Sequence, residues 1–327
     1  MLHLVAPRAV IELAFDPIVR IGDFSVRLDT IGAALVVFLT LVIGVVVAHA
    51  TPVDLIKPAD APGEVPVELN RLRADDLLYI AVAALPGAAV GARFGYWLLH
   101  WEFYQANPGA LFDLTQGGLQ LSLGVVGGVI TASLVAALLG APLGRWLHAM
   151  TIPVLLALAA GKAVMALGGS GQGQLSDASW ATAYTGPGPW GSLAPQLAAH
   201  PAQIYEALAT LAVVIIVAWV LAFDAFPGRN GGAFLFAIGT WAIARAIVAA
   251  TWRDPAVLGP LRMDQVISIA IAAVSYGLML LIGWVAVVRG RRTARGSGPP
   301  AEARPAARRA NVPGEPEWPD PASRPRI

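Results

Sequence analysis

The sequence has no cysteine and few charged residues, and both shortages narrow the classes of protein that it can represent. Without cysteine, the chain cannot form disulfides, thiolate metal sites, iron–sulfur clusters or a cysteine nucleophile. Only 13% of the 327 residues are charged, about half of the ~25% found in soluble globular domains. So few charges could not cover the surface of a soluble domain, which excludes an ordinary cytosolic enzyme and a disordered chain.

The charges and histidines that are present indicate neither a nucleic-acid partner nor a metal. The net charge is +1, so no overall field attracts an anionic polymer. The five histidines are scattered, without the H-E-x-x-H or H-x-x-E-H spacing of zinc sites. We therefore expect no nucleic-acid partner, no metal and no cofactor.

Hydrophobic residues are abundant, at 57% of the chain. They form apolar runs of about 20 residues, and a helix of that length crosses a hydrocarbon core of about 30 Å. We predict transmembrane helices over 29–49, 76–99, 119–140, 149–168, 203–223, 232–251 and 264–288. The predicted fold class is all-α, a polytopic membrane protein. Residues 1–290 are expected to form this domain, and the Pro- and Arg-rich segment 291–327 a disordered cytoplasmic tail.

The distribution of Lys and Arg predicts the orientation in the membrane. Loops 50–75, 141–148 and 224–231 contain Lys or Arg, as does the segment after the last helix, whereas loops 100–118 and 169–202 contain none. The N-terminus is therefore expected outside and the C-terminus in the cytoplasm, although arginines before the first helix and between the last two helices depart from this trend. The two loops without Lys or Arg contain several aromatic residues, which indicates either an interfacial belt or segments that cover a site.

Basic residues occur at membrane depth, toward the side expected to be outside. They are Arg93, Lys162 and Arg245 within predicted helices, and Arg253 just after the sixth. Ionisable residues at this depth are costly and mark functional sites by default. Since no acidic residue of the same helices lies at their depth, we expect a phospholipid phosphate to pair with them. The alternative is that the side chains merely extend to the interface. The nearest polar partners are Gln203, Glu206, Asp264 and Gln265.

A second polar feature is the heptapeptide His200-Pro201-Ala202-Gln203-Ile204-Tyr205-Glu206 at the expected outer start of the fifth helix. Proline suits the first helical turn, where its missing N–H costs nothing. Gln203 and Glu206 follow His200 at i+3 and i+6, so the three side chains are expected on one helical face. A histidine held beside a carboxylate can act as a general base, so we expect Glu206 to orient His200. The alternative interpretation is a polar helix cap.

These residues carry a resemblance to a known family. The segment HPAQIYEAL (200–208) is similar to the H-P-[ST]-Q-L-Y-E segment of bacterial prolipoprotein diacylglyceryl transferases. Other stretches resemble segments of the same family in the same order: 15–32, 75–96, 117–130, 161–173, 241–255 and 262–269. The resemblance extends over roughly residues 15–290.

The resemblance implies a seven-helix enzyme of the bacterial cytoplasmic (inner) membrane with an outward-facing site. Its substrates would be phosphatidylglycerol, among the membrane lipids, and the lipobox cysteine in the signal peptide of a prolipoprotein, with a thioether and glycerol phosphate as products. The implied catalytic residues are His200, Glu206, Arg245 and Ser122. The implied phosphate-binding residues are Arg93, Lys162, Arg245 and Arg253, supported by Gln203, Tyr205, Trp241 and Gln265.

The chain also departs from the family pattern. The family's histidine aligns with Ser122 or Leu123, its arginine with Lys162, its asparagine with Met165, its tyrosines with Ile31 and Trp241, and its glutamate with Ala249 or Ala250. These departures keep two other hypotheses open. The chain is then either a phospholipid-binding paralogue with impaired catalysis or a phospholipid-dependent transferase with a different acceptor.

Overall fold

The computed structural model describes residues 10–51, 72–112 and 118–296. The chain divides into two units, Met1–Gly283 and Trp284–Ile327, and the site described below lies in the first. Helix α8 continues to Gly296, past the expected start of the tail at residue 291. Residues 297–327 lie outside the described residues, so the disorder of the tail stays a prediction.

Seven helices in the described residues are long and apolar enough to cross a membrane, which confirms the predicted fold class. They are α1 (Leu28–Ala50), α2 (Ala74–Leu99), α4 (Leu121–Leu138), α5 (Leu143–Met165), α6 (Ala202–Ala222), α7 (Gly232–Val248) and α8 (Met263–Gly296). Helix α8 ends eight residues after the expected position 288. Helix α5 begins six residues before the expected position 149 and includes Arg145 and His148. Backbone hydrogen bonds continue past the apolar run, so hydropathy underestimates the length of this helix.

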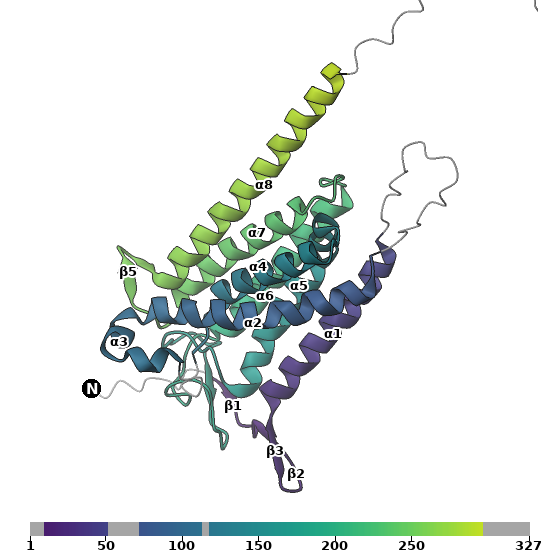
Figure 1. The fold of residues 1–327 in the computed structure, drawn as a ribbon. Coiled ribbons are helices and arrows are strands. Elements are labelled where there is room, and N and C mark those ends of the chain that lie inside the picture. Colours follow the sequence, from purple (N-terminus) through teal and green to yellow (C-terminus); the bar gives the residue numbers. More distant parts are fainter. Residues whose placement is uncertain (1–9, 52–71, 113–117, 297–327) are drawn as a thin grey trace, which may run out of the picture. The chain divides into compact units, whose positions relative to one another are not determined.

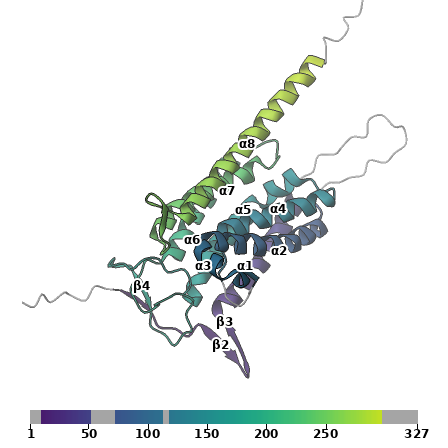
Figure 2. The same cartoon turned by 60° about the vertical axis from the view of Figure 1, so that its left-hand side comes forward.

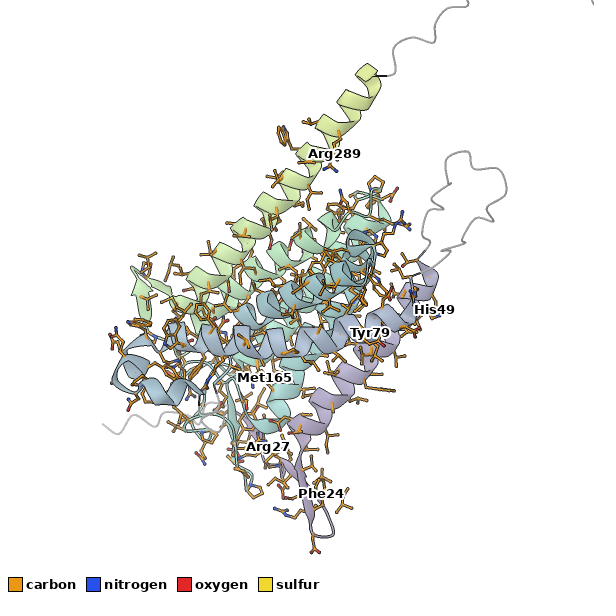
Figure 3. The ribbon with its side chains drawn as sticks, viewed as in Figure 1. Phe24, Arg27, His49, Tyr79, Met165 and Arg289 are labelled. Carbon is orange, nitrogen blue, oxygen red and sulfur yellow. The ribbon has the colours of Figure 1, made fainter. Side chains whose placement is uncertain are left out.

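Short elements precede the first of these helices or connect later ones (Figure 1, Figure 2). They are β1 (Ile11–Leu13), β2 (Ile18–Ile21), β3 (Phe24–Arg27), α3 (Trp101–Ala106), η1 (Pro108–Phe112), η3 (Ala166–Gly168), β4 (Thr182–Tyr184), η4 (Ala249–Thr251), β5 (Ala256–Leu258) and β6 (Leu261–Arg262). β1 pairs with β4 in parallel, whereas β2–β3 and β5–β6 are antiparallel pairs. Figure 3 shows Phe24 in the β2–β3 hairpin, and Arg27 and His49 at opposite ends of α1. The hairpin therefore extends from the end of the bundle at which α1 begins.

Helices α2 and α4 approach each other closely through glycines. A Cβ atom on Gly91 would lie 2.2 Å from the carbonyl oxygen of Leu123, and one on Gly127 would lie 2.2 Å from the carbonyl oxygen of Gly87. Any larger residue would have to push the two backbones apart. Small residues of this kind allow close helix packing in a membrane, where the hydrophobic effect does not drive association.

The largest buried apolar cluster joins α5, α6, α7 and α8. It includes Leu155, Val217, Trp241 and Ile267, none of which is more than 9% exposed. Helices α5 and α6 pack on each other, and α7 packs on both. This packing brings the polar ends of these helices together at the end of the bundle where the β2–β3 hairpin and α3 lie.

Candidate functional site

Four charged side chains from four different helices form a buried ion network. They are Lys162 of α5, Glu206 of α6, Arg245 of α7 and Asp264 of α8, and none is more than 5% exposed. Lys162 Nζ lies 3.0 Å from Glu206 Oε2. Arg245 pairs through Nη1 with Glu206 Oε1 and, at 3.0 Å, through Nη2 with Asp264 Oδ2. The two cations and two carboxylates of the ion network balance one another.

This pairing corrects the expectation that Lys162 and Arg245 lack an anion. Their partners lie on α6 and α8, and a single sequence does not reveal which helices are neighbours. A lipid phosphate is therefore not needed to neutralise these cations. A guanidinium nevertheless has five N–H donors, and the hydrogen bonds of Arg245 leave donors on its two Nη atoms for a further anion.

The start of α4 supplies two uncharged partners of the ion network. Ser122 is fully buried, and its hydroxyl accepts a hydrogen bond of 2.7 Å from Arg245 Nε. Gln120 caps α4, since its Oε1 accepts from the backbone N–H of Leu123. The Nε2 group of Gln120 donates to Asp264 Oδ1 at 2.5 Å. Sequence reasoning missed Gln120, because a glutamine at the start of a predicted helix is ordinary. Its role becomes visible only when α8, which carries Asp264, is known to lie beside it.

Trp252 is a second contact that the sequence did not reveal. Lys162 Nζ lies 4.6 Å from the centroid of the indole ring, and the guanidinium carbon of Arg245 lies 6.0 Å from it. These are cation–π distances. In the loop that follows, burial raises the pKa of the Asp254 carboxyl, and the carboxylate of Asp264 raises it further. The ion network therefore has an aromatic face and another acidic group near it.

His200 interacts with Tyr205 and not with Glu206. Its Nδ1 lies 3.2 Å from the hydroxyl of Tyr205, which also accepts a hydrogen bond of 2.6 Å from Trp180 Nε1. The carboxylate of Glu206 instead contacts the two cations of the ion network. The expectation that Glu206 orients His200 is therefore wrong. Helix α6 starts after its N-cap Pro201, so His200 lies outside the helix and helical spacing does not apply to it.

The supporting residues that the sequence singled out are buried or hold helices together. Gln203 is 1% exposed, and its Nε2 donates to the hydroxyl of Tyr184 at 3.1 Å. Gln265 joins α8 to α7, because its Nε2 donates to the carbonyl of Ala246. Trp241 is 1% exposed and belongs to the apolar cluster. Gln203, Gln265 and Trp241 therefore hold neighbouring parts of the structure together, but none of the three belongs to the ion network.

The two remaining predicted cations bind loop carbonyls. Arg93 donates through Nη2 to Ala110 at 2.9 Å. Arg253 donates through Nε to Gly173 at 2.6 Å and through Nη1 to Leu193. The expected group of four cations is thus divided, since Lys162 and Arg245 meet in the ion network while the other two hold connecting segments in place.

An apolar cavity of about 400 Å³ lies beside the start of α6. Its walls include Trp180, Tyr184, Gln203, Tyr205 and Leu208. The Oε1 atom of Gln203 is buried and has no hydrogen-bond partner among the residues that the structure describes. Among all the residues that the structure describes, no group of three or more His, Asp or Glu side chains could hold a metal ion. The cavity is therefore a largely apolar hollow beside the hydrogen-bonding side chains of Gln203 and Tyr205.

Comparison with known proteins agrees with the resemblance found in the sequence. The model of the prolipoprotein diacylglyceryl transferase family matches residues 18–285. A phosphatidylglycerol–prolipoprotein diacylglyceryl transferase of Clostridioides difficile is 26% identical over 198 residues, which are 61% of this chain and 75% of that protein. Proteins of the same name from Finegoldia magna and Bacillus mycoides are 25% and 28% identical, over 71% and 62% of this chain and 84% and 74% of their own lengths. Because the family match covers more than half of the sequence, this chain belongs to the prolipoprotein diacylglyceryl transferase family.

Proposed function

We propose that this protein transfers the diacylglyceryl group of phosphatidylglycerol to the lipobox cysteine of a prolipoprotein. The observation that carries the proposal is the family match over residues 18–285, which includes every member of the buried ion network. Ionisable side chains at membrane depth are expected to serve function. The three relatives compared above carry this activity in their names.

In the proposed reaction, the cysteine sulfur bonds to the glyceryl carbon of the lipid. The bond between that carbon and the phosphate oxygen breaks, and glycerol phosphate leaves with the electron pair. The thiol proton passes to a base. The chain itself has no cysteine, so the acceptor sulfur comes from the substrate.

Arg245 and Lys162 are the groups proposed to bind the phosphate. Arg245 retains N–H donors beyond those that its partners occupy. Arginine binds phosphate with paired hydrogen bonds, whereas lysine acts as a point charge. Donors held in place before the reaction stabilise the charge that develops on the departing oxygen. Arg93 and Arg253 would act less directly, by holding the loops whose carbonyls they bind.

His200 is the proposed base for the thiol. A cysteine thiol has a pKa of about 8.5, so modest assistance suffices to form the thiolate. The hydroxyl of Tyr205 faces Nδ1 of His200 and orients the ring. The apolar cavity beside Tyr205 offers space for apolar parts of a substrate. Glu206 serves the cations of the ion network in this scheme, and Ser122 serves Arg245.

The proposed location is the bacterial inner membrane, with the ion network toward its outer face. Loops 50–75, 141–148 and 224–231 contain Lys or Arg, so the end of the bundle where they lie is expected to face the cytoplasm. The ion network lies at the other end, near the start of α8 and the end of α5.

A phospholipid-binding paralogue with impaired catalysis is the second candidate. The observation that favours it is the charge balance of the ion network. Glu206 and Asp264 already form ion pairs with Lys162 and Arg245, the two cations proposed to act on the phosphate. A transferase with another acceptor would share the lipid site but yield a different product.

The test uses the purified chain in vesicles of phosphatidylglycerol with a lipobox peptide, and mass spectrometry detects the thioether. We expect the diacylglyceryl peptide from the unmodified chain. Arg245→Ala is expected to abolish the product and weaken phosphatidylglycerol binding, whereas His200→Ala is expected to reduce the product and leave binding intact. Folded protein that binds the lipid and forms no product would refute the proposal in favour of the paralogue. A lipid adduct on another added acceptor would instead support the third hypothesis.

A further inference from the structure

Asp264 is the member of the ion network that the proposed reaction does not use. It lies in the first turn of α8 and is 5% exposed. Its Oδ2 is 3.0 Å from Arg245 Nη2, and its Oδ1 accepts from Gln120 Nε2. Both carboxylate oxygens are therefore bound, one by a cation and the other by a neutral amide.

Asp264 is one of three groups that fix the guanidinium of Arg245. Nε donates to Ser122 of α4, Nη1 to Glu206 of α6 and Nη2 to Asp264 of α8. Because a guanidinium is planar, contacts to all three nitrogens determine both its position and its rotation. Without Asp264 the Nη2 end of the plane would lose its partner, and the N–H groups that remain for a phosphate would lose their direction.

Gln120 holds Asp264 in turn. Its side chain connects the N–H of Leu123 at the start of α4 with the carboxylate of Asp264, and its backbone N–H donates to the carbonyl of Ala92 on α2. The residue is 3% exposed. The orientation of Arg245 is thereby tied through Gln120 and Asp264 to the close contact of α2 with α4.

The charges of the ion network also depend on Asp264. Lys162 and Arg245 are balanced by Glu206 and Asp264, and each of the four is buried. Replacing Asp264 by a neutral residue leaves Glu206 as the one carboxylate in direct contact with the two cations among the described residues. The altered site would still attract an anion, but Arg245 would no longer be held in one orientation.

We infer that Asp264 is a positioning residue, which acts through Arg245 by fixing the direction of the N–H groups offered to the lipid phosphate. The inference rests on the proposed function for its effect on turnover. It differs from a purely structural role because it predicts that binding of the anionic lipid and the rate of transfer respond differently to loss of the carboxylate.

The first test compares Asp264→Asn with the unmodified chain in phosphatidylglycerol vesicles. Asparagine keeps the size of the side chain and removes its charge. We expect kcat to fall about 100-fold, as displacement of a catalytic group by about 1 Å can cause. The Kd for phosphatidylglycerol should stay within a factor of about three, because Lys162 and Arg245, the two cations that attract the phosphate, both remain. Asp264→Glu should restore part of the rate.

Asp76→Asn is the matched control. Asp76 is 8% exposed and lies in the first turn of α2, near Arg73 and at the other end of the bundle from the ion network. It tests whether loss of a buried carboxylate from a first helical turn is enough to reduce the rate. Equal losses of rate in Asp76→Asn and Asp264→Asn would overturn the inference.

The second test combines Asp264→Asn with Arg245→Lys. If Asp264 acts through Arg245, Asp264→Asn has little further effect once lysine replaces the arginine, because contacting residues that act together are not additive. Independent effects on kcat, or a parallel loss of lipid binding and melting temperature in Asp264→Asn, would contradict the inference.

If the unmodified chain forms no thioether, the proposed function fails. The same two-residue comparison of melting temperatures then decides the inference, because Asp264 and Arg245 are in contact, and independent effects there would overturn it.

Discussion

The hydroxyl of Tyr205 lies between two other ring systems, and its hydrogen bonds determine how His200 can act. Trp180 Nε1 only donates, so the hydroxyl accepts from it. The hydroxyl then either donates to His200 Nδ1 or accepts from it. In a neutral ring, the second arrangement leaves Nε2 free to accept a thiol proton. Tyr205 therefore orients the base in the proposed reaction.

Tyr205→Phe is expected to slow transfer about tenfold while leaving the fold intact, because the hydroxyl makes two hydrogen bonds and the loss of each costs only about 1 kcal/mol. The ring would keep its packing, but His200 would lose its partner. Initial rates of thioether formation measure the effect. The matched control is Tyr79→Phe on α2 (Figure 3). The side chain of Tyr79 is 59% exposed. Similar rates in the two variants would show that the Tyr205 hydroxyl does not orient the base.

Single residues were predictable where their chemistry conflicts with an apolar environment. Lys162 and Arg245 stood out because cations at membrane depth are costly, and the structure places both in the ion network. Gln120 and Trp252 did not stand out, since polar caps and aromatic residues are ordinary near helix ends. Their contacts depend on which helices are neighbours, and that information is tertiary.

At the scale of helices, close packing of α2 and α4 positions Gln120 for its contact with α8. The backbone N–H of Gln120 donates to Ala92 of α2, and a Cβ atom on Gly95 would lie 2.8 Å from Gln120 Oε1. The glycines of α2 and α4 therefore do more than fill space, because they allow the approach that brings Gln120 to Asp264.

Gly91→Ala is expected to destabilise the protein by about 1–3 kcal/mol, the usual cost of overpacking. The added methyl would lie 2.2 Å from the carbonyl oxygen of Leu123, so α2 and α4 would have to separate. Unfolding in mixed detergent measures the change. Gly277→Ala on α8 is the control, because nothing lies within 4 Å of a Cβ atom there, and alanine in a helix interior is favoured over glycine by roughly 0.5–1 kcal/mol. Equal destabilisation by both changes would contradict the proposed role of close packing.

The spanning helices were predictable because each is a long apolar run, and their number and order agree with the structure. The early start of α5 was not, since Arg145 and His148 interrupt hydropathy without interrupting a helix. The strands were not predicted either. β1 and β4 have three residues each and pair across more than 160 positions of sequence, so their existence depends on tertiary contact.

At the scale of the whole molecule, the proposed reaction requires the ion network to lie at the outer side of the membrane. The distribution of Lys and Arg predicts this orientation. The order of the spanning helices along the chain then assigns every connecting segment to one side. The absence of cysteine makes the prediction easy to test, because a single introduced thiol is the sole thiol in the chain.

Asp23→Cys in the β2–β3 turn and Ala225→Cys between α6 and α7 place thiols at exposed positions on opposite sides. In intact cells, a membrane-impermeant maleimide should label the first variant, and it should label the second only after permeabilisation. The unmodified chain, which lacks cysteine, is the control for background. The reverse labelling pattern would place the ion network at the cytoplasmic side and exclude the proposed reaction with an exported precursor.

The central claim is that Arg245, held in the ion network, stabilises the phosphate that departs during diacylglyceryl transfer. The most direct measurement is the rate of thioether formation on a lipobox peptide in phosphatidylglycerol vesicles for Arg245→Lys, with Arg73→Lys at the other end of the bundle as the matched control. Arg245→Lys keeps the charge and removes the paired N–H donors, so we predict a loss of about 100-fold or more, with Arg73→Lys unchanged. Equal rates for Arg245→Lys and the unmodified chain would contradict the claim.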